Sequence, residues 1–435
     1  MGQPTRVVIV GGGFAGYQAA RSLARALPKR APDVEIVLVN RTDYFLYLPL
    51  LPEVAAGVVD PRRVTVSLPG TLPGVRLVLG TVDGVSLEER RVSYTDPEGT
   101  RHQLGYDRLV LAVGSVNKLL PVPGVAQYAH GFRGVAEALY LRDHVIRQLE
   151  LAAAADQPAE REARCTFVVV GAGYTGTEIA AQGPLFTQAI AAGHKELKDQ
   201  KVRWILLDLA PKVLPELDPR LSRAAHRVLL QRGVEVRMRT SVREATHEGV
   251  HLTIGGFLPT KSIIWCVGVR PDPLVQATGL KVDRGRLVVT PTLAVPGHPE
   301  VFACGDAAAV PDLTRPGEIT GMTAQHATRQ GALAGRNVAA SLGHGRARPY
   351  RHHDLGFVVD LGGAQAAANP FRIPLSGWPA KAVARGYHLL AMPGNRLRTA
   401  ADWVLEAALG RQTVQLGLVR SAAVPLESAE GARLE

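Results

Sequence analysis

The chain has 435 residues, of which 46% are hydrophobic, and a formal net charge of +11 at pH 7. This length accommodates two or three domains with a large core. Apolar runs stay short of the roughly 20 residues of a spanning helix, and Met1–Thr5 lead directly into a strand, so we expect neither a membrane span nor a signal peptide. The charge suits nucleic acid, an anionic membrane surface or simple solvation of the protein. We expect no nucleic acid partner, because the sequence contains no module that binds one.

The three cysteines, Cys165, Cys266 and Cys304, are far apart and form no CxxC pair. This spacing argues against metal and disulfide frameworks, and we predict no metal site. All three fall in or beside apolar strands, which predicts buried and unreactive thiols.

The first motif follows a short apolar run, Arg6–Val10, which is typical of a buried parallel strand. Gly11, Gly13 and Gly16 come next at GxGxxG spacing, and a helix is predicted over 18–27. In such a unit the first glycine permits the turn, the second lets a pyrophosphate approach the backbone, and the third lets the helix pack closely. We call residues 11–16 the first glycine turn and predict that it binds a dinucleotide.

The same pattern recurs over Thr166–Glu178, where Gly171, Gly173 and Gly176 follow another apolar strand. We call residues 171–176 the second glycine turn, and a helix is predicted to continue to about residue 192. Two such turns in one chain predict two dinucleotides held face to face.

The next strand of each unit ends in a polar residue. After 202–207 this residue is Asp208, which would accept bonds from both ribose hydroxyls and repel a 2′-phosphate, so NADH is favoured over NADPH. Lys212 nearby would weaken this preference, and a solvated strand-end carboxylate is the alternative. After 34–39 the residue is Asn40, followed by Arg41. An amide still bonds a hydroxyl, without charge-assisted strength.

Other strand ends also predict ligand contacts. The apolar strands 109–114 and 263–268 close in Gly114 and Gly268, where a ligand could approach the backbone. Asp306 follows strand 301–303 and would either accept bonds from a polyol or ribityl chain or cap a helix. The apolar segment 43–54 forms either a wall against a flat ring system or ordinary core.

The remaining elements are predicted from hydrophobic periodicity. Strands are expected at 62–66, 75–82, 91–94, 235–238, 251–254 and 287–289, helices at 135–149, 218–232, 378–392 and 396–409, and an alanine- and charge-rich linker at 152–163. Strands that alternate with helices predict the α/β class with parallel sheets.

In this order the segments resemble the flavoproteins that bind two dinucleotides, and within them the type II (non-proton-pumping) NADH:quinone dehydrogenase family. The resemblance covers residues 6–345 and rests on both glycine turns, on 263–271 (IIWCVGVRP), on 301–306 (VFACGD) and on 323–331 (TAQHATRQG). The Ala-Gln-x-Ala-x-x-Gln pattern in the last segment is the most specific to the quinone-reducing branch. The resemblance implies an α/β fold with two Rossmann-like domains, for FAD and NADH, and a C-terminal amphipathic helical segment.

The resemblance also implies domains and residue roles. An FAD-binding domain would comprise 1–134 and 287–365, an NADH-binding domain 135–286, and a membrane-docking or dimerisation segment 366–435. FAD would contact Gly11, Gly13, Gly16, Asn40, Arg41, Val82, Gly114, Asp306 and Ala324, and NADH would contact Gly171, Gly173, Gly176, Asp208 and Gly268. As catalytic residues, Glu178 would stand beside nicotinamide and flavin, and Gln325 would face the quinone headgroup. A locally packed helix glutamine is the alternative for Gln325.

Two positions depart from the family pattern. Asn40 replaces an acidic residue, and Asp360 in the segment LGFVVDLGG stands where the family carries a basic residue. The absence of cysteine between Leu46 and Glu53 excludes the disulfide-reductase relatives, because flavin electrons would lack a dithiol to receive them. No cysteine follows Cys304, which disfavours a sulfide:quinone oxidoreductase.

The C-terminal segment carries two amphipathic helices. In the first, Val383, Tyr387 and Leu390 share one face, and Lys381, Arg385 and His388 share another. Residues 366–420 contain seven Lys or Arg against two Asp or Glu. Basic amphipathic helices suit an anionic membrane surface, whereas packing on the body or a homodimer interface would give the same pattern.

We therefore predict a cytoplasmic flavoenzyme, peripheral on the inner face of the cell membrane, that takes hydride from NADH to FAD and passes two electrons to a quinone such as menaquinone or ubiquinone. One alternative is a soluble NAD(P)H-dependent flavin oxidoreductase whose acceptor is a ferredoxin or a biosynthetic metabolite. Another is a flavoprotein redox sensor.

Overall fold

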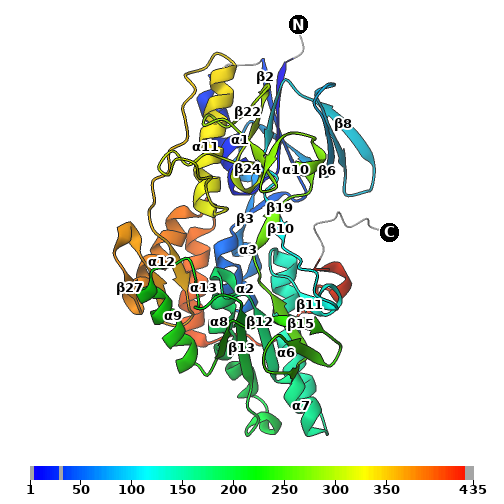
Figure 1. Cartoon of the computed structure of the whole chain (residues 1–435), viewed down its shortest axis with the longest axis vertical. Coiled ribbons are helices and arrows are strands. Elements are labelled where there is room, and N and C mark those ends of the chain that lie inside the picture. Colours follow the sequence, from blue (N-terminus) through cyan, green and yellow to red (C-terminus); the bar gives the residue numbers. More distant parts are fainter. Residues whose placement is uncertain (1–3, 29–32, 427–435) are drawn as a thin grey trace.

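The computed structural model describes residues 4–28 and 33–426. Its two largest sheets lie one above the other along the long axis of the molecule (Figure 1). The upper sheet has the order β22-β23-β9-β1-β2-β5. Its strands are β1 (Thr5–Val10), β2 (Val34–Asn40), β5 (Val75–Leu79), β9 (Arg108–Leu111), β22 (Ala294–Val295) and β23 (His298–Ala303).

The lower sheet has the order β11-β18-β12-β13-β14, and all its pairings are parallel. Its strands are β11 (Ala129–His130), β12 (Thr166–Val170), β13 (Arg203–Asp208), β14 (Glu235–Met238) and β18 (Ser262–Trp265). The helices of this part are α5 (Val125–Tyr128), α6 (Val135–Ala153), α7 (Pro158–Arg164), α8 (Tyr174–Ala191) and α9 (Pro219–Gln231). The α/β class with two parallel-sheet units is confirmed.

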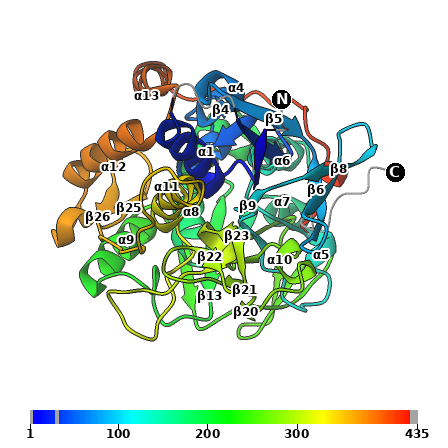
Figure 2. The same cartoon turned by 90° about the horizontal axis from the view of Figure 1, so that it is seen from above.

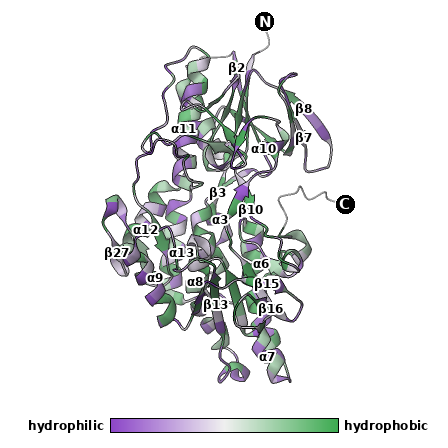
Figure 3. Ribbon diagram, viewed as in Figure 1, coloured by the Kyte–Doolittle hydropathy of each residue, from purple (hydrophilic) through white to green (hydrophobic). Residues whose placement is uncertain are grey.

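The central strands contain continuous apolar runs, because both faces of these runs are covered. Val7, Val8 and Ile9 of β1 are fully buried, as are Val168 and Val169 of β12. Figure 3 shows the hydrophobic colouring of these central strands. Each glycine turn directly follows one of these buried strands, β1 or β12, which holds its start in place.

Helix α1 (Phe14–Ala26) packs directly on α11 (Ala324–Ser341), and the two lie side by side in Figure 2. Small residues make this contact possible. A Cβ atom at Gly331 or Gly335 would overlap the carbonyl oxygen of Ala15 or Ala19. The segment 323–331 is thereby held against the helix that follows the first glycine turn.

The chain passes between the two sheets through the antiparallel pair β10 (Ser115–Asn117) and β19 (Val269–Pro271). Smaller sheets decorate both parts: β3 (Tyr44–Leu46) with β4 (Thr65–Ser67); β6 (Thr81–Ser86), β7 (Arg91–Thr95) and β8 (Arg101–Gly105); β15 (Val242–Ala245), β16 (Gly249–Leu252) and β17 (Phe257–Pro259); β20 (Val282–Asp283), β21 (Arg286–Val288) and β24 (Ala308–Ala309); β25 (Val358–Asp360), β26 (Ala366–Ala368) and β27 (Leu375–Ser376). Short helices complete the set: α2 (Leu51–Ala55), α3 (Pro61–Val64), α4 (Leu68–Thr71) and α10 (Leu274–Ala277).

The C-terminal part begins with the β25–β27 sheet and continues into α12 (Trp378–Ala391) and α13 (Arg396–Leu409). Helix α12 packs on β25 and β26, and α13 packs on α3. Beyond α13 the chain reaches α6, where the Asp143 carboxylate accepts bonds from the N–H groups of Leu416 and Gly417. The last nine residues of the expected segment 366–435 lie outside the described residues, and the expected domain boundaries stay a prediction.

Two local predictions were wrong. Residues 62–64 of the expected strand 62–66 are helical, because Pro61 starts α3 and the Asp60 side chain caps it by accepting from Arg62 N–H at 2.8 Å. The expected linker 152–163 instead contains the end of α6 and most of α7. Pro158 starts α7, and Glu160 pairs with Arg164 one turn later.

None of the helices in the described ranges combines the length and the apolar character that crossing a bilayer requires.

Candidate active site

The first glycine turn connects β1 to α1. Gly11 has a φ of +96°, which glycine adopts without strain. A Cβ at Gly16 would overlap the carbonyl oxygen of Gly11, so α1 can approach the strand only at a glycine. At Gly13, by contrast, a Cβ would meet no atom within 4 Å. The backbone at the N-terminus of α1 is therefore uncovered, and a phosphate can approach its N–H groups.

The second glycine turn, between β12 and α8, has the same construction. Gly171 has a φ of +107°, and a Cβ at Gly176 would overlap the Gly171 carbonyl oxygen. Gly173 again faces open space within 4 Å. The space that both turns leave open fits one pyrophosphate each.

Asn40 and Asp208 close the two turns in the same way. The Asn40 Oδ1 accepts from the N–H of Gly12 at 2.8 Å, and the Asp208 Oδ2 accepts from the N–H of Ala172 at 2.5 Å. The Asn40 Nδ2 also donates to the Thr42 carbonyl at 2.8 Å, which a carboxylate could not do. The first departure from the family pattern therefore has a structural reason.

Lys212 does not lie free beside Asp208. Its Nζ donates to the Leu217 carbonyl at 2.8 Å, while Asp208 Oδ1 accepts from Ala210 N–H at 2.7 Å. The ammonium group is held by its own loop, so the expectation that it weakens a preference at Asp208 finds no support in this geometry. Asp208 is half-buried in the turn, which argues against a merely solvated strand-end carboxylate.

The two strand-end glycines lie at opposite ends of the antiparallel β10–β19 pair, which connects the two sheets. Lys118 N–H donates to the Gly268 carbonyl at 3.1 Å, and Asp272 N–H donates to the Gly114 carbonyl at 3.2 Å. A Cβ at either glycine would meet no atom within 4 Å. The β10–β19 pair thus links the segments that follow the two strand ends, with Gly114 beside Asp272 and Gly268 beside Lys118.

Asp306 lies in a short 3₁₀ turn, Gly305–Ala307, after β23. Its Oδ2 accepts from the Ser115 hydroxyl at 2.5 Å, and the Arg133 guanidinium donates to the same hydroxyl at 3.3 Å. The cap position of this turn belongs to Cys304, so the helix-cap alternative for Asp306 was wrong. The carboxylate keeps further lone pairs for a polyol.

Helix α11 contributes Ala324, Gln325 and Gln330. Gln330 is fully buried; its Oε1 accepts from Gly305 N–H at 2.8 Å and its Nε2 donates to Thr320 Oγ1 at 2.9 Å. It locks α11 onto the turn that carries Asp306. Gln325 donates through Nε2 to the Gly356 carbonyl, and its buried Oε1 has no partner within the described ranges.

The other expected contact residues lie in exposed or half-buried positions around these turns. Arg41 is exposed directly after Asn40, Val82 is half-buried in β6, and Ala324 is half-buried at the start of α11. The roles of these three side chains in binding FAD stay predictions.

Glu178 lies in the second turn of α8 and is half-buried. Its Oε1 accepts from the backbone N–H of Asp360 at 2.9 Å, and burial raises its pKa well above the ordinary value. Asp360 in turn forms an ion pair with Lys381 of α12. The β25 segment carries Asp360 instead of a basic residue, and Lys381 of α12 supplies the basic group beside it. This pairing explains the second departure from the family pattern.

Sequence reasoning missed the buried carboxylate Glu53 of α2. Its Oε2 accepts from Trp403 Nε1 at 2.5 Å, and its Oε1 lies 3.7 Å from Lys381 Nζ. A charged residue inside the apolar run LPLLPEV was a signal, because such residues are buried only with partners. Lys381 and His388 share one face of α12 as expected, and both are buried, so at these two residues the helix packs on the body, which was the alternative to membrane contact.

The apolar segment 43–54 is core packed against the first glycine turn. Phe45 and Tyr47 are 3% and 1% exposed, and the Phe45 ring meets the edge of Phe14, the residue after Gly13, at 5.0 Å between centroids. Tyr47 Oη lies 3.1 Å from His388 Nδ1. The core interpretation is confirmed for these two aromatic side chains.

The cysteine prediction is also confirmed. Cys165 and Cys304 are buried and Cys266 is partly buried, and all three thiols are free. Burial raises the pKa of Cys165 to about 11 and that of both other thiols to about 12. Unreactive thiols follow, because the thiolate is the reactive form.

Two matching glycine turns, each at the end of its own parallel sheet, define an oxidoreductase of the class that binds two dinucleotides. The model of the pyridine nucleotide-disulphide oxidoreductase family matches residues 5–331.

Two relatives refine this class. Type II NADH:quinone oxidoreductase NdhA of Mycobacterium tuberculosis is 32% identical over 415 residues, which cover 91% of this chain and 85% of that protein. Demethylphylloquinone reductase NdbB of Synechocystis is 28% identical, with coverages of 92% and 95%. The chain belongs to the pyridine nucleotide-disulphide oxidoreductase family and, within it, to the type II NADH:quinone oxidoreductases.

Among solved structures, NDH2 of Plasmodium falciparum in complex with NADH superposes with a TM-score of 0.86 at 17% identity, covering 95% of this chain and 100% of that one. The sulfide:quinone oxidoreductase of Aquifex aeolicus gives 0.68 at 17% identity, with coverages of 94% and 96%. At these identities the likeness shows the fold alone.

Proposed function

We propose that this protein oxidises NADH through bound FAD and reduces a quinone, with FAD on the first glycine turn and NADH on the second. The observation that carries the arrangement is the matching construction of the two glycine turns, each of which leaves the backbone uncovered, at Gly13 and at Gly173. FAD, when bound, supplies the capacity to take a hydride from NADH and to release two electrons onward. The protein's own residues bind, orient and hold protons.

The FAD site would be built from the upper sheet. Gly11, Gly13 and Gly16 leave room for the pyrophosphate, and the Asp306 carboxylate offers free lone pairs to hydroxyl groups. The other contributors we propose are Asn40, Arg41, Val82, Gly114 and Ala324. In the lower sheet Gly171, Gly173, Gly176, Asp208 and Gly268 would hold NADH.

Glu178 is the residue we propose beside the nicotinamide. Its raised pKa keeps the carboxyl protonated at pH values where an ordinary glutamate is ionised, so it can donate a hydrogen bond or pass on a proton. Its bond to the Asp360 backbone fixes the orientation of the side chain.

Gln325 is the residue we propose beside the quinone. Its Nε2 is engaged with the Gly356 carbonyl, whereas its Oε1 is buried and accepts no bond within the described ranges. A buried acceptor without a donor is costly, so a bound donor would be stabilised there. A quinol hydroxyl is such a donor and a quinone carbonyl is not. The Gln325 Oε1 would therefore favour binding of the reduced headgroup over the oxidised one.

The outer faces of α12 and α13 are proposed to lie on an anionic membrane surface at the inner face of the cell membrane. Leu390, Leu397 and Val404 are 76%, 86% and 67% exposed, and Arg396 and Arg398 are exposed beside them. Apolar side chains next to cationic ones suit the lipid interface. A homodimer through the same face is the competing arrangement.

Anaerobic titration tests the reaction. The purified protein should show the visible spectrum of bound FAD, lose it on addition of NADH, and regain it on addition of a menaquinone or ubiquinone analogue. Bleaching by NADH without recovery by either quinone would favour the ferredoxin, metabolite or sensor alternatives instead.

Vesicle binding tests the surface. Leu397→Glu with Val404→Glu should abolish sedimentation with vesicles that contain phosphatidylglycerol, while Leu230→Glu, at an exposed position of α9, should leave it unchanged. If the double variant sediments normally but changes from dimer to monomer, the face is a homodimer interface.

A further inference from the structure

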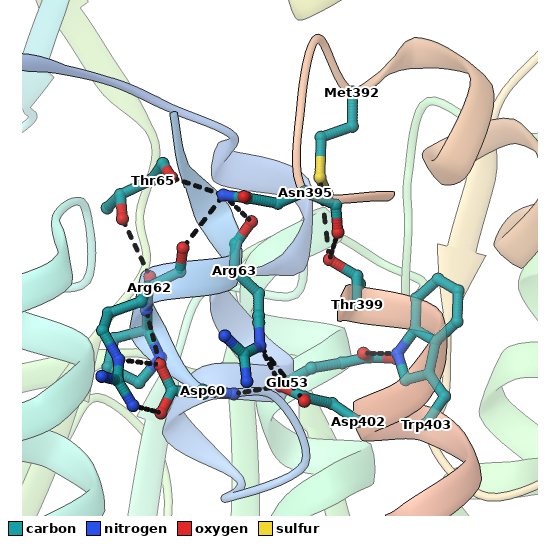
Figure 4. Close-up of polar contacts among 11 residues, drawn as sticks. Glu53, Asp60, Arg62, Arg63, Thr65, Met392, Asn395, Thr399, Asp402 and Trp403 are labelled. Atoms are coloured by element: carbon teal, nitrogen blue, oxygen red, sulfur yellow. Dashed lines mark hydrogen bonds and ion pairs between the residues drawn. The ribbon is translucent and has the colours of Figure 1, made fainter. Parts of the chain in front are cut away.

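Glu53 is enclosed by four separate segments of the chain. It is 3% exposed on α2, and its two oxygens point to different C-terminal helices. One accepts the Trp403 Nε1–H of α13 at 2.5 Å (Figure 4), and the other lies 3.7 Å from Lys381 Nζ of α12. A buried carboxylate with two such partners fixes the relative position of both helices.

The contacts continue without a break to the candidate active site. The Lys381 ammonium group forms an ion pair with the Asp360 carboxylate, and the Asp360 backbone N–H donates to Glu178 Oε1 at 2.9 Å. A path of direct polar contacts therefore leads from the indole of Trp403 on α13 to the carboxyl of Glu178 on α8.

We infer that Glu53 is a positioning residue that couples the seating of α13 on the body to the protonation of Glu178. The inference rests on the proposed role of Glu178. It assigns to the outermost helix, which carries the exposed apolar face, a direct influence on the site where NADH is oxidised.

The electrostatic sign of the coupling follows from the buried charges. Burial and the Asp360 carboxylate raise the pKa of Glu53 to about 7, against the opposing effects of Lys381, the Trp403 bond and Arg385. Burial also raises the pKa of Glu178, and Asp360 and Glu53 add to that rise. Neutralising Glu53 therefore lowers the pKa of Glu178.

The charged and polar groups that face Glu53 come from four elements. They are Lys381 and Arg385 of α12, Trp403 of α13, Asp360 of β25 and Glu178 of α8. Helix α3 also contacts α2, but its Arg63 pairs with Asp402 rather than with Glu53. Helix α6 presents Leu141 and Val145 to the same helix.

Helix α13 has a second, separate anchor that provides a control. The Asp402 carboxylate accepts from Arg63 Nε at 3.1 Å and from the backbone N–H of Asp60 at 3.0 Å (Figure 4). Asp402 precedes Trp403 directly, and its hydrogen bonds and ion pair go to Asp60 and Arg63 of the α3 region. Loss of this ion pair leaves the Trp403–Glu53 bond, through which the coupling runs, and the charges around Glu178 in place.

The test is the rate of flavin reduction by NADH in anaerobic single-turnover mixing, followed across about pH 6 to pH 9. This half-reaction needs no acceptor. In Glu53→Gln, the pH midpoint of the rate should fall by about one unit, since the neutral amide removes a negative charge near Glu178. Below the Glu53 pKa the variant and wild-type rates should converge.

Trp403→Phe is the second variant, and it keeps the Glu53 charge and an aromatic ring. It removes the bond that lowers the Glu53 pKa, so Glu53 stays protonated to higher pH. The midpoint should shift in the same direction as in Glu53→Gln, by less. Asp402→Asn should leave the midpoint unchanged.

Two results would overturn the inference: a midpoint that does not move in the folded Glu53→Gln or Trp403→Phe protein, or an equal shift in Asp402→Asn. A Glu178→Gln variant distinguishes failure of the coupling from failure of the proposed role of Glu178. If Glu178→Gln leaves the wild-type pH profile intact, the role of Glu178 itself fails. If Glu178→Gln abolishes the midpoint and the other variants do not shift it, only the coupling fails.

Discussion

Asn40 and Asp208 are structural equivalents in the two halves of this protein, and each accepts a backbone N–H at the second residue of its glycine turn. They differ in what the rest of the side chain does. The Asn40 amide donates to the Thr42 carbonyl, whereas Asp208 accepts a second N–H, from Ala210. One turn is closed by a neutral amide that both accepts and donates hydrogen bonds, and the other by a carboxylate that only accepts them.

Asn40→Asp should destabilise the protein. The new carboxylate would face the Thr42 carbonyl oxygen in place of a donor, and a lost hydrogen bond with acceptor repulsion costs about 1–3 kcal/mol. Thermal unfolding should show a lower Tm together with weaker FAD retention. Asn40→Ser, which removes the amide without adding charge, should lower the Tm less, and the reverse order would contradict this account.

Asp208→Ala should weaken NADH more than NADPH. The carboxylate is positioned at the end of β13 to bond ribose hydroxyls and to repel a 2′-phosphate. Loss of such bonds should raise the KM for NADH about tenfold and leave that for NADPH nearly unchanged. Equal losses for both cofactors would remove Asp208 from the ribose site.

Gly173→Ala and Gly176→Ala should fail in different ways. A Cβ at residue 173 enters open space, so that variant should fold with a normal Tm and bound FAD, and only its KM for NADH should rise. A Cβ at residue 176 overlaps the Gly171 carbonyl oxygen, so that variant should lose stability or fail to fold. Normal NADH kinetics in Gly173→Ala would place the pyrophosphate elsewhere.

Glu178→Gln should slow turnover by about 100-fold while FAD stays bound. The amide matches the size of the carboxyl and can still accept the Asp360 N–H, so the fold is preserved. Steady-state kinetics with NADH and a quinone analogue, together with the visible spectrum, measure both quantities. Unchanged kinetics would remove Glu178 from the mechanism.

The sequence predicted the parts of the site whose determinants are local. Gly11, Gly13 and Gly16 lie within six residues. The positive φ of Gly11 and the contact of Gly16 with the Gly11 carbonyl oxygen both arise within this one strand–turn–helix unit, and Gly13 leaves open space at its centre. Both sheets were predictable for the same reason, because buried parallel strands are continuous apolar runs.

Local sequence patterns could not predict the buried cluster of Glu53, Lys381 and Trp403. Glu53 meets Lys381 and Trp403 across more than 300 positions of sequence. Helical periodicity placed Lys381 correctly with His388 on one face of α12 but could not show that acidic groups and Tyr47 cover that face. A charged face that pairs inside the fold and one that faces solvent have the same spacing.

Acid should weaken the lower part of the molecule through His144. This side chain is buried on α6, its Nε2 lies 2.9 Å from Ser262 Oγ, and burial lowers its pKa to about 3. In the unfolded chain the pKa returns to its ordinary value near 6.5. Between these two values the unfolded state binds more protons, so stability falls as the pH drops through this window, by up to about 1.4 kcal/mol per pH unit.

His144→Asn removes the titrating group and keeps a donor for Ser262. The dependence of Tm on pH between about pH 7 and about pH 4 should be shallower in this variant than in the wild type. His130, whose pKa burial lowers to about 4, accounts for part of the remaining slope. His247→Asn, at an exposed position, is the matched control and should keep the wild-type slope. Equal slopes in all three proteins would show that His144 does not carry the acid sensitivity.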